Sequence, residues 1–184
     1  MTGIIIAIIV IAVVAIVGFA AWRYIQHRRS EQLKDRFGPE YDRAKDQYGS
    51  KAESVLSDRQ KTVDEAGVKP LSAGDRRRYL DEWQSIQARF VDDPNGSVIR
   101  ADHVVTDVMR SMNYPAGVFK EREDAVSVQY PDVADNYRRA HAIAHQAQDG
   151  EASTDDLREA TLLLRSLFEK LVENVESRTE SAVT

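Results

Sequence analysis

The sequence contains no cysteine, and proline (5) and glycine (9) are sparse among its 184 residues. The absence of cysteine excludes disulfide bonds, thiolate zinc sites and cysteine nucleophiles, and it is typical of a reducing compartment. No segment shows sustained alternation of apolar and polar residues with β-branched enrichment, as a half-buried strand would. Asn95-Gly96 could mark a hairpin, but it lies between helical patterns. These absences predict an all-α chain.

One long apolar segment stands at the N-terminus. Residues 3–22 carry no charged side chain. As a helix they would measure about 30 Å, which matches the hydrocarbon core of a bilayer. A helix apolar on every side would need a much larger domain around it to serve as a core helix. Residues 1–22 are therefore predicted to be a transmembrane anchor inserted in the lipid bilayer, marked by Gly3, Ile4, Ile11, Val17, Gly18 and Trp22.

The charges flanking this segment predict its orientation. Arg23, Arg28 and Arg29 follow the apolar run closely, while no basic side chain precedes it. The positive-inside rule places such an arginine cluster in the cytoplasm. We therefore expect a single-pass protein of the inner (plasma) membrane, with its N-terminus outside and residues 23–184 in the cytoplasm.

A cleaved signal peptide is the competing interpretation of residues 1–20. Gly18-Phe19-Ala20 resembles a cleavage site with small residues. A signal peptide, however, has a basic n-region and a shorter apolar core, and Met-Thr-Gly supplies neither lysine nor arginine. If cleavage did occur, the remainder would be a secreted helical domain.

Residues 23–69 are predicted to form a juxtamembrane helical stalk or linker. The first helix is expected to continue to Phe37, where Gly38-Pro39 interrupts it. Residues 39–66 are rich in charge and poor in large apolar groups, which is typical of a solvated helix, and Gly49-Ser50 suggests a break. Gly67 and Pro70 end this region.

Residues 70–176 show compact amphipathic patterns. Ser72, Asp93 and Ser153 are expected N-caps, Pro131 an expected helix start, and Gly150 an expected C′ residue. Apolar residues recur at spacings of three and four in four segments, near 73–91, 94–112, 131–149 and 154–176, and a shorter helix with Phe119, Val126 and Tyr130 is expected near 118–129. Short marked turns between helices predict a C-terminal antiparallel bundle of about five helices. Residues 177–184 are expected to be a frayed tail.

The net charge of −5 is concentrated near the C-terminus, where residues 149–184 hold nine acidic and four basic side chains. This balance argues against a nucleic-acid surface there. It also argues against contact of that end with an anionic leaflet.

His141 and His145 are the strongest candidates for a metal site, because four residues of separation place two imidazoles on one helical face. The intervening glutamate of a His-Glu-x-x-His motif is missing, and Asp149 is the sole nearby third ligand. We therefore predict polar residues on the rim of the bundle, and no metal.

Two further clusters have ordinary structural interpretations. Arg76-Arg77-Arg78 could contact lipid phosphates or an acidic partner, but flanking acids favour a solvated face or pairing with the acidic last helix. The aromatic residues Tyr79, Trp83 and Phe90 could line a groove, but their helical spacing favours the core.

No motif of catalysis is present: the chain has no glycine-rich phosphate loop and no recognisable Ser-His-Asp order. The sequence therefore predicts no enzyme, no catalytic residue, no cofactor and no evident small-molecule substrate. It predicts a helical-bundle interaction module, with a groove that takes a partner helix or peptide. The alternative is a lipid-contacting structural protein of the envelope or of stress responses.

Six segments together resemble an uncharacterised family of small bacterial proteins common in actinobacteria, usually described as membrane or secreted proteins. The segments are Arg36-Phe37-Gly38-Pro39-Glu40-Tyr41-Asp42-Arg43, Pro70-Leu71-Ser72, Gln87-Ala88-Arg89-Phe90-Val91-Asp92-Asp93-Pro94, Tyr114-Pro115, Asn136-Tyr137-Arg138 and Gly150-Glu151-Ala152-Ser153-Thr154. The resemblance covers most of residues 30–170. It implies a bacterial inner-membrane setting and assigns no activity or site residue.

Overall fold

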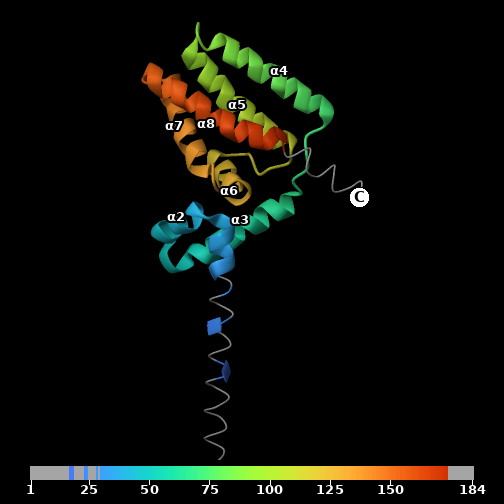
Figure 1. Ribbon diagram of the computed structural model, residues 1–184, viewed down its shortest axis with the longest axis vertical. Helices are drawn as coiled ribbons and strands as arrows, with labels where there is room; N and C mark the ends of the chain where they lie inside the picture. Colours follow the sequence, from blue (N-terminus) through green and yellow to red (C-terminus); the bar gives the residue numbers. More distant parts are fainter. Residues whose placement is uncertain (1–16, 19–22, 25–27, 29, 174–184) are drawn as a thin grey trace, which may run out of the picture. The chain divides into compact units, whose positions relative to one another are not determined.

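The computed structural model describes residues 17–18, 23–24, 28 and 30–173, and these ranges contain helices, turns and loops but no strand (Figure 1). The helices are α2 (Pro39–Tyr48), the 3-10 turn η1 (Gly49–Lys51), α3 (Ala52–Ala66), α4 (Ala73–Arg89), α5 (Pro94–Ser111), α6 (Phe119–Gln129), α7 (Ala134–Gln148) and α8 (Thr154–Glu173). Residues 30–37 are also helical. The all-α prediction is confirmed for the described residues.

The predicted anchor falls mostly outside the described residues. Val17 and Gly18 are described and helical, as are Arg23 and Arg28. The other residues named for the anchor and its orientation lie outside the described residues, as does the predicted tail 177–184. They are Gly3, Ile4, Ile11, Trp22 and Arg29. Among the described residues, no helix is both long and apolar enough to cross a bilayer. The transmembrane anchor thus stays a prediction from the sequence.

The described residues form two compact units that divide between Glu53 and Ser54. In the first unit, Gly38 has a φ of 47° and Pro39 begins α2. A positive φ suits glycine, and proline suits the first helical position because the amide hydrogen it lacks would have no helical partner. The predicted helix break at Gly38-Pro39 is confirmed, and so is the break at Gly49, where η1 begins.

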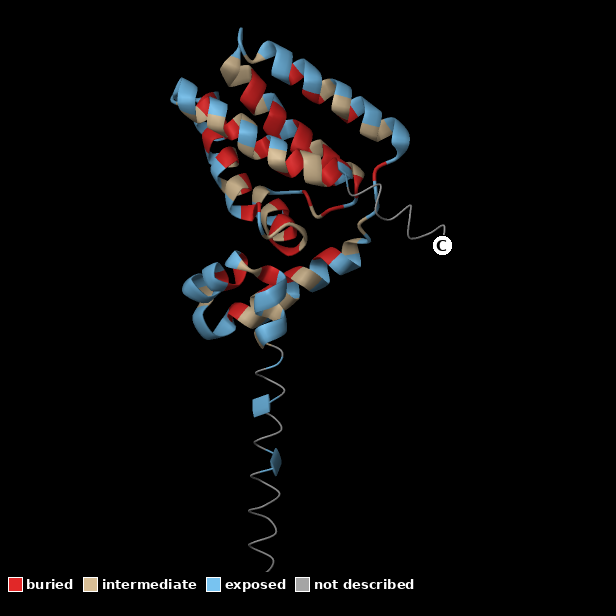
Figure 2. Ribbon diagram, viewed as in Figure 1, coloured by how far each residue is buried: buried red, intermediate tan, exposed pale blue. Residues whose placement is uncertain are grey.

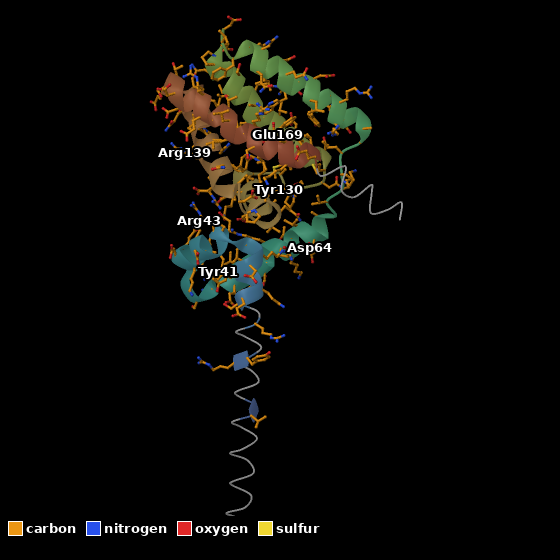
Figure 3. All side chains as sticks on the ribbon, viewed as in Figure 1. Tyr41, Arg43, Asp64, Tyr130, Arg139 and Glu169 are labelled. Carbon is orange, nitrogen blue, oxygen red and sulfur yellow. The ribbon has the colours of Figure 1, made fainter. Side chains whose placement is uncertain are left out.

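A polar triad joins three helical segments of this first unit. Tyr41 lies on α2 (labelled in Figure 3), and its hydroxyl is 2.8 Å from Ser30 Oγ. Both hydroxyls donate to Glu53 Oε1, at 2.7 Å from Ser30 and 3.1 Å from Tyr41. Phe37, Tyr41 and Ala44 are buried. The solvated stalk expected from residue 39 onward is therefore wrong at Tyr41 and Ala44, because breaks at two glycines let short helices pack instead of extending.

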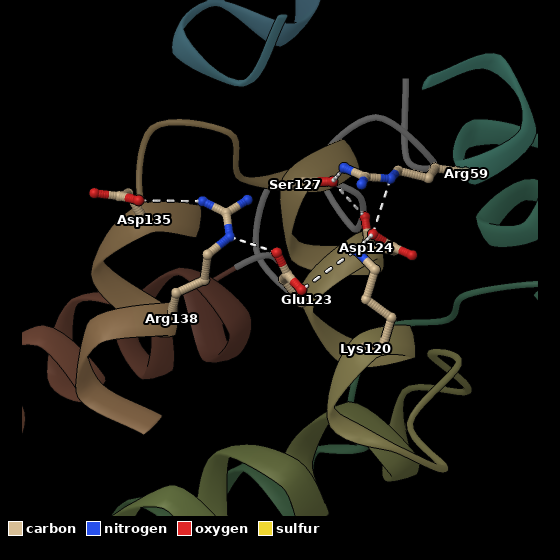
Figure 4. Close-up of polar contacts among 7 residues, drawn as sticks. All are labelled: Arg59, Lys120, Glu123, Asp124, Ser127, Asp135 and Arg138. Carbon is tan, nitrogen blue, oxygen red and sulfur yellow. Dashed lines mark hydrogen bonds and ion pairs between the residues drawn. The ribbon is translucent and has the colours of Figure 1, made fainter. Parts of the chain in front are cut away.

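In the second unit, α3 packs through a buried arginine (Figure 4). The Nε atom of Arg59 lies 2.8 Å from Asp124 Oδ1 on α6, and its Nη1 donates to Ser127 Oγ at 3.2 Å. The Arg59 side chain is 8% exposed, and Leu56 and Val63 of the same helix are buried. The solvated surface expected for α3 is thus corrected as well. The charge-rich composition predicted a solvated helix, but Arg59 is buried because its charge is paired with Asp124 inside the fold.

Helices α4 to α8 form the bundle, with α5 in contact with α4, α7 and α8. Figure 2 shows buried residues concentrated on α5 and on the inward sides of its neighbours. The apolar stripes are buried as their spacing predicts: Val98, Ala101, Val105, Val108 and Met112 near α5, and Leu157, Ala160, Leu164, Leu167 and Leu171 on α8. The predicted helical bundle is confirmed for the described residues.

The expected caps are in place. Ser72 Oγ accepts from the Asp75 amide at 3.0 Å, Asp93 Oδ1 from Gly96 at 2.9 Å, and Ser153 Oγ from Asp156 at 3.2 Å. Each bond satisfies one of the amides that the first helical turn leaves without a partner.

The ends of α7 differ from the expectation in one respect. Pro131 lies in a turn and does not open the helix, because the Val133 amide donates back to the Tyr130 carbonyl at 3.0 Å. Proline suits the second position of such a turn. At the other end Gly150 has a φ of 73°, and the Glu151 amide donates to the Gln146 carbonyl at 2.9 Å. This Schellman arrangement confirms Gly150 as the C′ residue.

Candidate functional site

A histidine and an aspartate meet between α5 and α7. The Nδ1 atom of His141 lies 3.1 Å and 3.0 Å from the two carboxylate oxygens of Asp102. Both side chains are largely buried, with exposures of 14% for His141 and 8% for Asp102. The carboxylate favours a proton on Nδ1, which fixes the orientation of the imidazole.

Aromatic rings hold the imidazole of His141 on two further sides. The ring of Phe119 stacks on it, with centroids 3.8 Å apart and an interplanar angle of 10°. The ring of His145 meets it edge-on at 5.0 Å and 89°. Within the described residues no hydrogen bond engages Nε2 of His141, so this nitrogen is the one available to a ligand.

Arg122 of α6 lies beside this pair and is 8% exposed. Its Nε donates to the hydroxyl of Tyr137 at 3.0 Å, and its guanidinium carbon lies 5.6 Å from the centre of the Phe119 ring. Burial, together with the nearby Asp102 carboxylate, raises the pKa of Tyr137 to about 12, although Arg122 opposes the rise. Tyr137 therefore remains protonated at neutral pH and can accept the arginine's hydrogen bond.

These side chains open onto a hollow of about 390 Å³ in the bundle. Three arginines and three histidines line it against two aspartates: Arg100, Arg110, Arg122, His103, His141, His145, Asp102 and Asp107. Arg100 Nε is paired with Glu82 at 2.8 Å, and Arg110 with Asp107 at 3.3 Å. The hollow is polar and faintly basic, and it is suited to bind an anionic group.

The structure brings the rings of His141 and His145 together, edge to face. Asp149, the third ligand considered from the sequence, is the exposed C-cap of α7. Among the described residues no group of three or more histidine, aspartate or glutamate side chains could hold a metal ion. His141 is instead engaged by Asp102, which lies 39 residues away in sequence.

The other two clusters singled out from the sequence have structural roles. In the basic run, Arg76 Nε donates to the Val172 carbonyl near the end of α8 at 3.0 Å, and Arg78 pairs with Asp75 at 2.9 Å. The Ser72 hydroxyl, together with Arg78, lowers the pKa of Asp75. Tyr79 and Trp83 are buried in the core, and Phe90 is half-buried.

A second polar cluster links α6 to α7 (Figure 4). Arg138 Nε donates to Glu123 Oε1 at 2.5 Å, and its Nη1 donates to Asp135 at 3.3 Å. Burial acts to raise the pKa of Glu123, but its hydrogen bond with Arg138 and the charge of Lys120 outweigh burial, and the pKa is lowered. Every charge in this cluster has an opposite partner, so the cluster holds helices together.

Sequence reasoning missed Asp102 and Arg122. Asp102 interrupts the apolar stripe of α5, beside Ala101, which is a signal for a buried acid with a partner. The partner could not be identified, because the sequence does not show which helix faces α5 at that point. Arg122 lies on a helix whose polar sequence gives no distinct buried face.

Comparison with protein-family models, curated proteins and solved structures finds no match to this chain. The resemblance to a family of bacterial membrane proteins therefore stays a prediction from the residues that suggest it.

Proposed function

We propose that this chain is a single-pass inner-membrane protein that presents a cytoplasmic helical bundle as an interaction module. The uncharged run of residues 3–22, followed by Arg23, Arg28 and Arg29, carries this proposal. Its length matches a bilayer core, and its charge asymmetry favours an inward-facing C-terminal side. The bundle supplies the binding part, because it contains a polar hollow between α5 and α7.

We propose a binding role for this hollow in preference to a catalytic one. The Asp102–His141 pair could in principle act as a base. Among the described residues that line the hollow, Thr106 alone carries a hydroxyl, and it donates to the Asp102 carbonyl of its own helix at 3.1 Å. If His141 activated this hydroxyl as a nucleophile, the hydroxyl would have to point at the imidazole. Because it bonds to its own helix instead, a binding role has more support than a catalytic one.

Contact of Arg76-Arg77-Arg78 with lipid phosphates has less support. Arg76 is engaged at the end of α8, and Arg78 pairs with Asp75 and lies over the Tyr79 ring, 4.3 Å from its centre. Two of the three cations therefore already have partners within the bundle. The lipid bilayer is proposed as a partner of residues 3–22, and a protein or ligand as the partner of the bundle.

A topology reporter tests the proposal. An enzyme active in one compartment alone, fused after Thr184, is expected to report the cytoplasm, and the chain is expected to sediment with membranes after alkaline extraction. A variant with Arg23, Arg28 and Arg29 replaced by glutamine, and with lysines added before Gly3, should have its orientation in the membrane inverted in part of the population. The fused enzyme would then report the outside. Recovery of the wild-type fusion outside the membrane, in soluble form, would reject the anchor and favour a signal peptide.

The matched control removes the same number of arginines elsewhere. Arg139, Arg158 and Arg165 are exposed, with side-chain exposures of 64%, 64% and 50%. Arg139 is labelled on α7 in Figure 3. Their triple replacement with glutamine should leave orientation unchanged, because these positions are far along the sequence from the apolar run. Inversion by this control as well would show that topology does not depend on the flanking arginines.

A further inference from the structure

Arg122 is a buried cation that has no carboxylate partner among the described residues. Arg122 is 8% exposed, and within the described part of the chain the one hydrogen bond of its side chain runs from Nε to the Tyr137 hydroxyl. Removing a guanidinium from water without an opposite charge is costly. By contrast, the buried Arg59 and the nearly buried Arg138 both have carboxylate partners. Arg122 lines the hollow between α5 and α7, where an anion could complete its coordination.

His141 offers a second donor to the same space. Asp102 holds Nδ1, and Phe119 covers one face of the ring, so the imidazole is fixed before any ligand arrives. When the ring is protonated, Nδ1 donates to Asp102 and Nε2 donates to an anion in the hollow. A ligand therefore does not have to order this side chain on binding.

The remaining charges of the hollow are largely compensated. Asp107 is paired with Arg110 and Arg100 with Glu82, and the charge of Asp102 is compensated when its partner His141 is protonated. The positive charge left over is that of Arg122, and His103, His145 and Gln148 add further hydrogen-bonding groups at the opening. The two aspartates lie in the hollow, but each is held by a basic partner and is not free to repel an anion at full strength.

We infer that the hollow between α5 and α7 is a binding site for a phosphate group, with Arg122 and His141 as its principal donors. A guanidinium fork matches the oxygens of a phosphate, and a tetrahedral oxyanion has oxygens left for an imidazolium and for a side-chain amide such as Gln148. The volume of about 390 Å³ exceeds that of a phosphate ion, so the phosphate would be carried by a larger ligand. This inference rests on the proposed function, since it names the ligand chemistry of the same module.

The test uses the full chain purified in detergent and inorganic phosphate as the probe, titrated by calorimetry at constant ionic strength against chloride. Saturable binding with one phosphate per chain is expected. Arg122→Gln should weaken it about tenfold or more, since a charge-assisted hydrogen bond is lost. Arg139→Gln makes the same change at an exposed residue of α7 and should leave the affinity unchanged. Circular dichroism establishes that each variant is folded.

A second pair of variants keeps the inference testable if Arg122→Gln does not fold. Gln146 and Gln148 are both exposed residues of the last turn of α7, but Gln148 lines the hollow and Gln146 does not. The same isosteric change, Gln→Glu, places a negative charge at each position. Gln148→Glu should weaken phosphate binding about threefold or more by repulsion, while Gln146→Glu should have a much smaller effect.

The outcomes separate cleanly. No phosphate binding by the folded wild-type chain, equal weakening by both glutamate variants, or acetate binding as tight as phosphate would overturn the inference. Glycerophosphoglycerol, the deacylated headgroup of phosphatidylglycerol, identifies the source: tighter binding than inorganic phosphate assigns the site to a lipid headgroup, and weaker binding to a soluble phosphate ligand. If the reporter fusion lies in the cytoplasm but the purified chain binds no phosphate, this inference fails and the proposed topology stands. If the purified chain binds phosphate but the fusion lies outside the membrane, the proposed topology fails and this inference stands.

Discussion

The indole ring of Trp83 on α4 stacks on the phenyl ring of Phe168 on α8, with ring centroids 4.4 Å apart and an interplanar angle of 13°. Both residues are buried, at 5% and 1% exposure. They lie 85 positions apart in the sequence, so this contact joins the first and last helices of the bundle. The buried indole nitrogen has no acceptor among the residues that the structure describes, so the contribution of Trp83 is one of packing.

Truncation of Trp83 should therefore destabilise the bundle far more than a change to another aromatic residue. We expect Trp83→Ala to lower the free energy of unfolding by about 3–5 kcal/mol, because it removes a large buried ring and leaves a cavity. Trp83→Phe should cost less, since it keeps a ring and removes an unsatisfied donor. Urea unfolding followed by circular dichroism measures both. Leu162→Ala, at a residue 63% exposed on α8, is the control and should change stability little.

The ion pair between α3 and α6 gives a second prediction. Arg59→Ala removes the partner of Asp124 Oδ1 and of Ser127 Oγ, and it should cost about 2–4 kcal/mol. Asp124 retains Lys120 at 2.8 Å, which limits the loss. Lys61→Ala on the same helix removes a surface pair with Glu65 and should cost under about 0.5 kcal/mol. Equal effects of the two variants in urea unfolding would argue against packing of α3 through Arg59.

Two glycines should respond to the same substitution with opposite signs. Gly150 has a φ of 73°, in the left-handed region, so Gly150→Ala should destabilise by about 1 kcal/mol. Gly74 lies in the first turn of α4 with ordinary space around it, the nearest atom to an added Cβ being Ser72 Oγ at 3.8 Å. Gly74→Ala should stabilise by up to about 0.5 kcal/mol, because alanine loses less entropy on entering a helix. Thermal unfolding of the two variants in parallel would show the difference, and shifts of the same sign would contradict it.

The raised pKa of Tyr137 predicts that the folded chain loses stability at high pH. The ordinary pKa of tyrosine is 10.0, and burial raises that of Tyr137 to about 12. Between these values the unfolded chain releases the proton while the folded chain retains it, so rising pH favours unfolding. The stabilisation is complete below pH 10 and falls by about 1.4 kcal/mol per pH unit until the folded group ionises.

The control for this prediction is Tyr137→Phe, which has no proton to release. It should be less stable at neutral pH, because Arg122 loses its 3.0 Å hydrogen bond, but its stability should decline less steeply between pH 10 and pH 12. Unfolding in urea at several pH values measures both slopes. Parallel curves for the wild type and the variant would show that Tyr137 has an ordinary pKa in the folded chain.

Much of the bundle could be predicted from the sequence because its determinants are local. The spacing of Tyr79, Trp83 and Ile86 shows one apolar face, and Ser72 satisfies an amide only three residues away. A helix and its caps depend on residues within a few positions of each other. Pro131 shows the limit of such reasoning, since a proline that suits a helix start suits a turn equally well, and the hydrogen bonds of Tyr130 and Val133 decide between them.

The candidate site could not be predicted in the same way. The sequence identified His141 and His145 from their spacing, but the partner of His141 is Asp102 on another helix. Arg59 likewise lies in the charge-rich segment 39–66, which the sequence predicts to be solvated, but its partner Asp124 lies on another helix. Pairing of buried charges depends on which helices face each other, and that is set by the packing of whole apolar faces.

The sequence by itself therefore determined the helices of this protein, their caps and the expectation of a membrane anchor, since each depends on local spacing, composition and charge. The tertiary structure alone decided that Asp102, Arg122 and His141 share one hollow, and that α3 is held to α6. The physical reason is the range of the interactions: helical periodicity acts over a few residues, whereas a polar site is assembled from side chains that packing brings together.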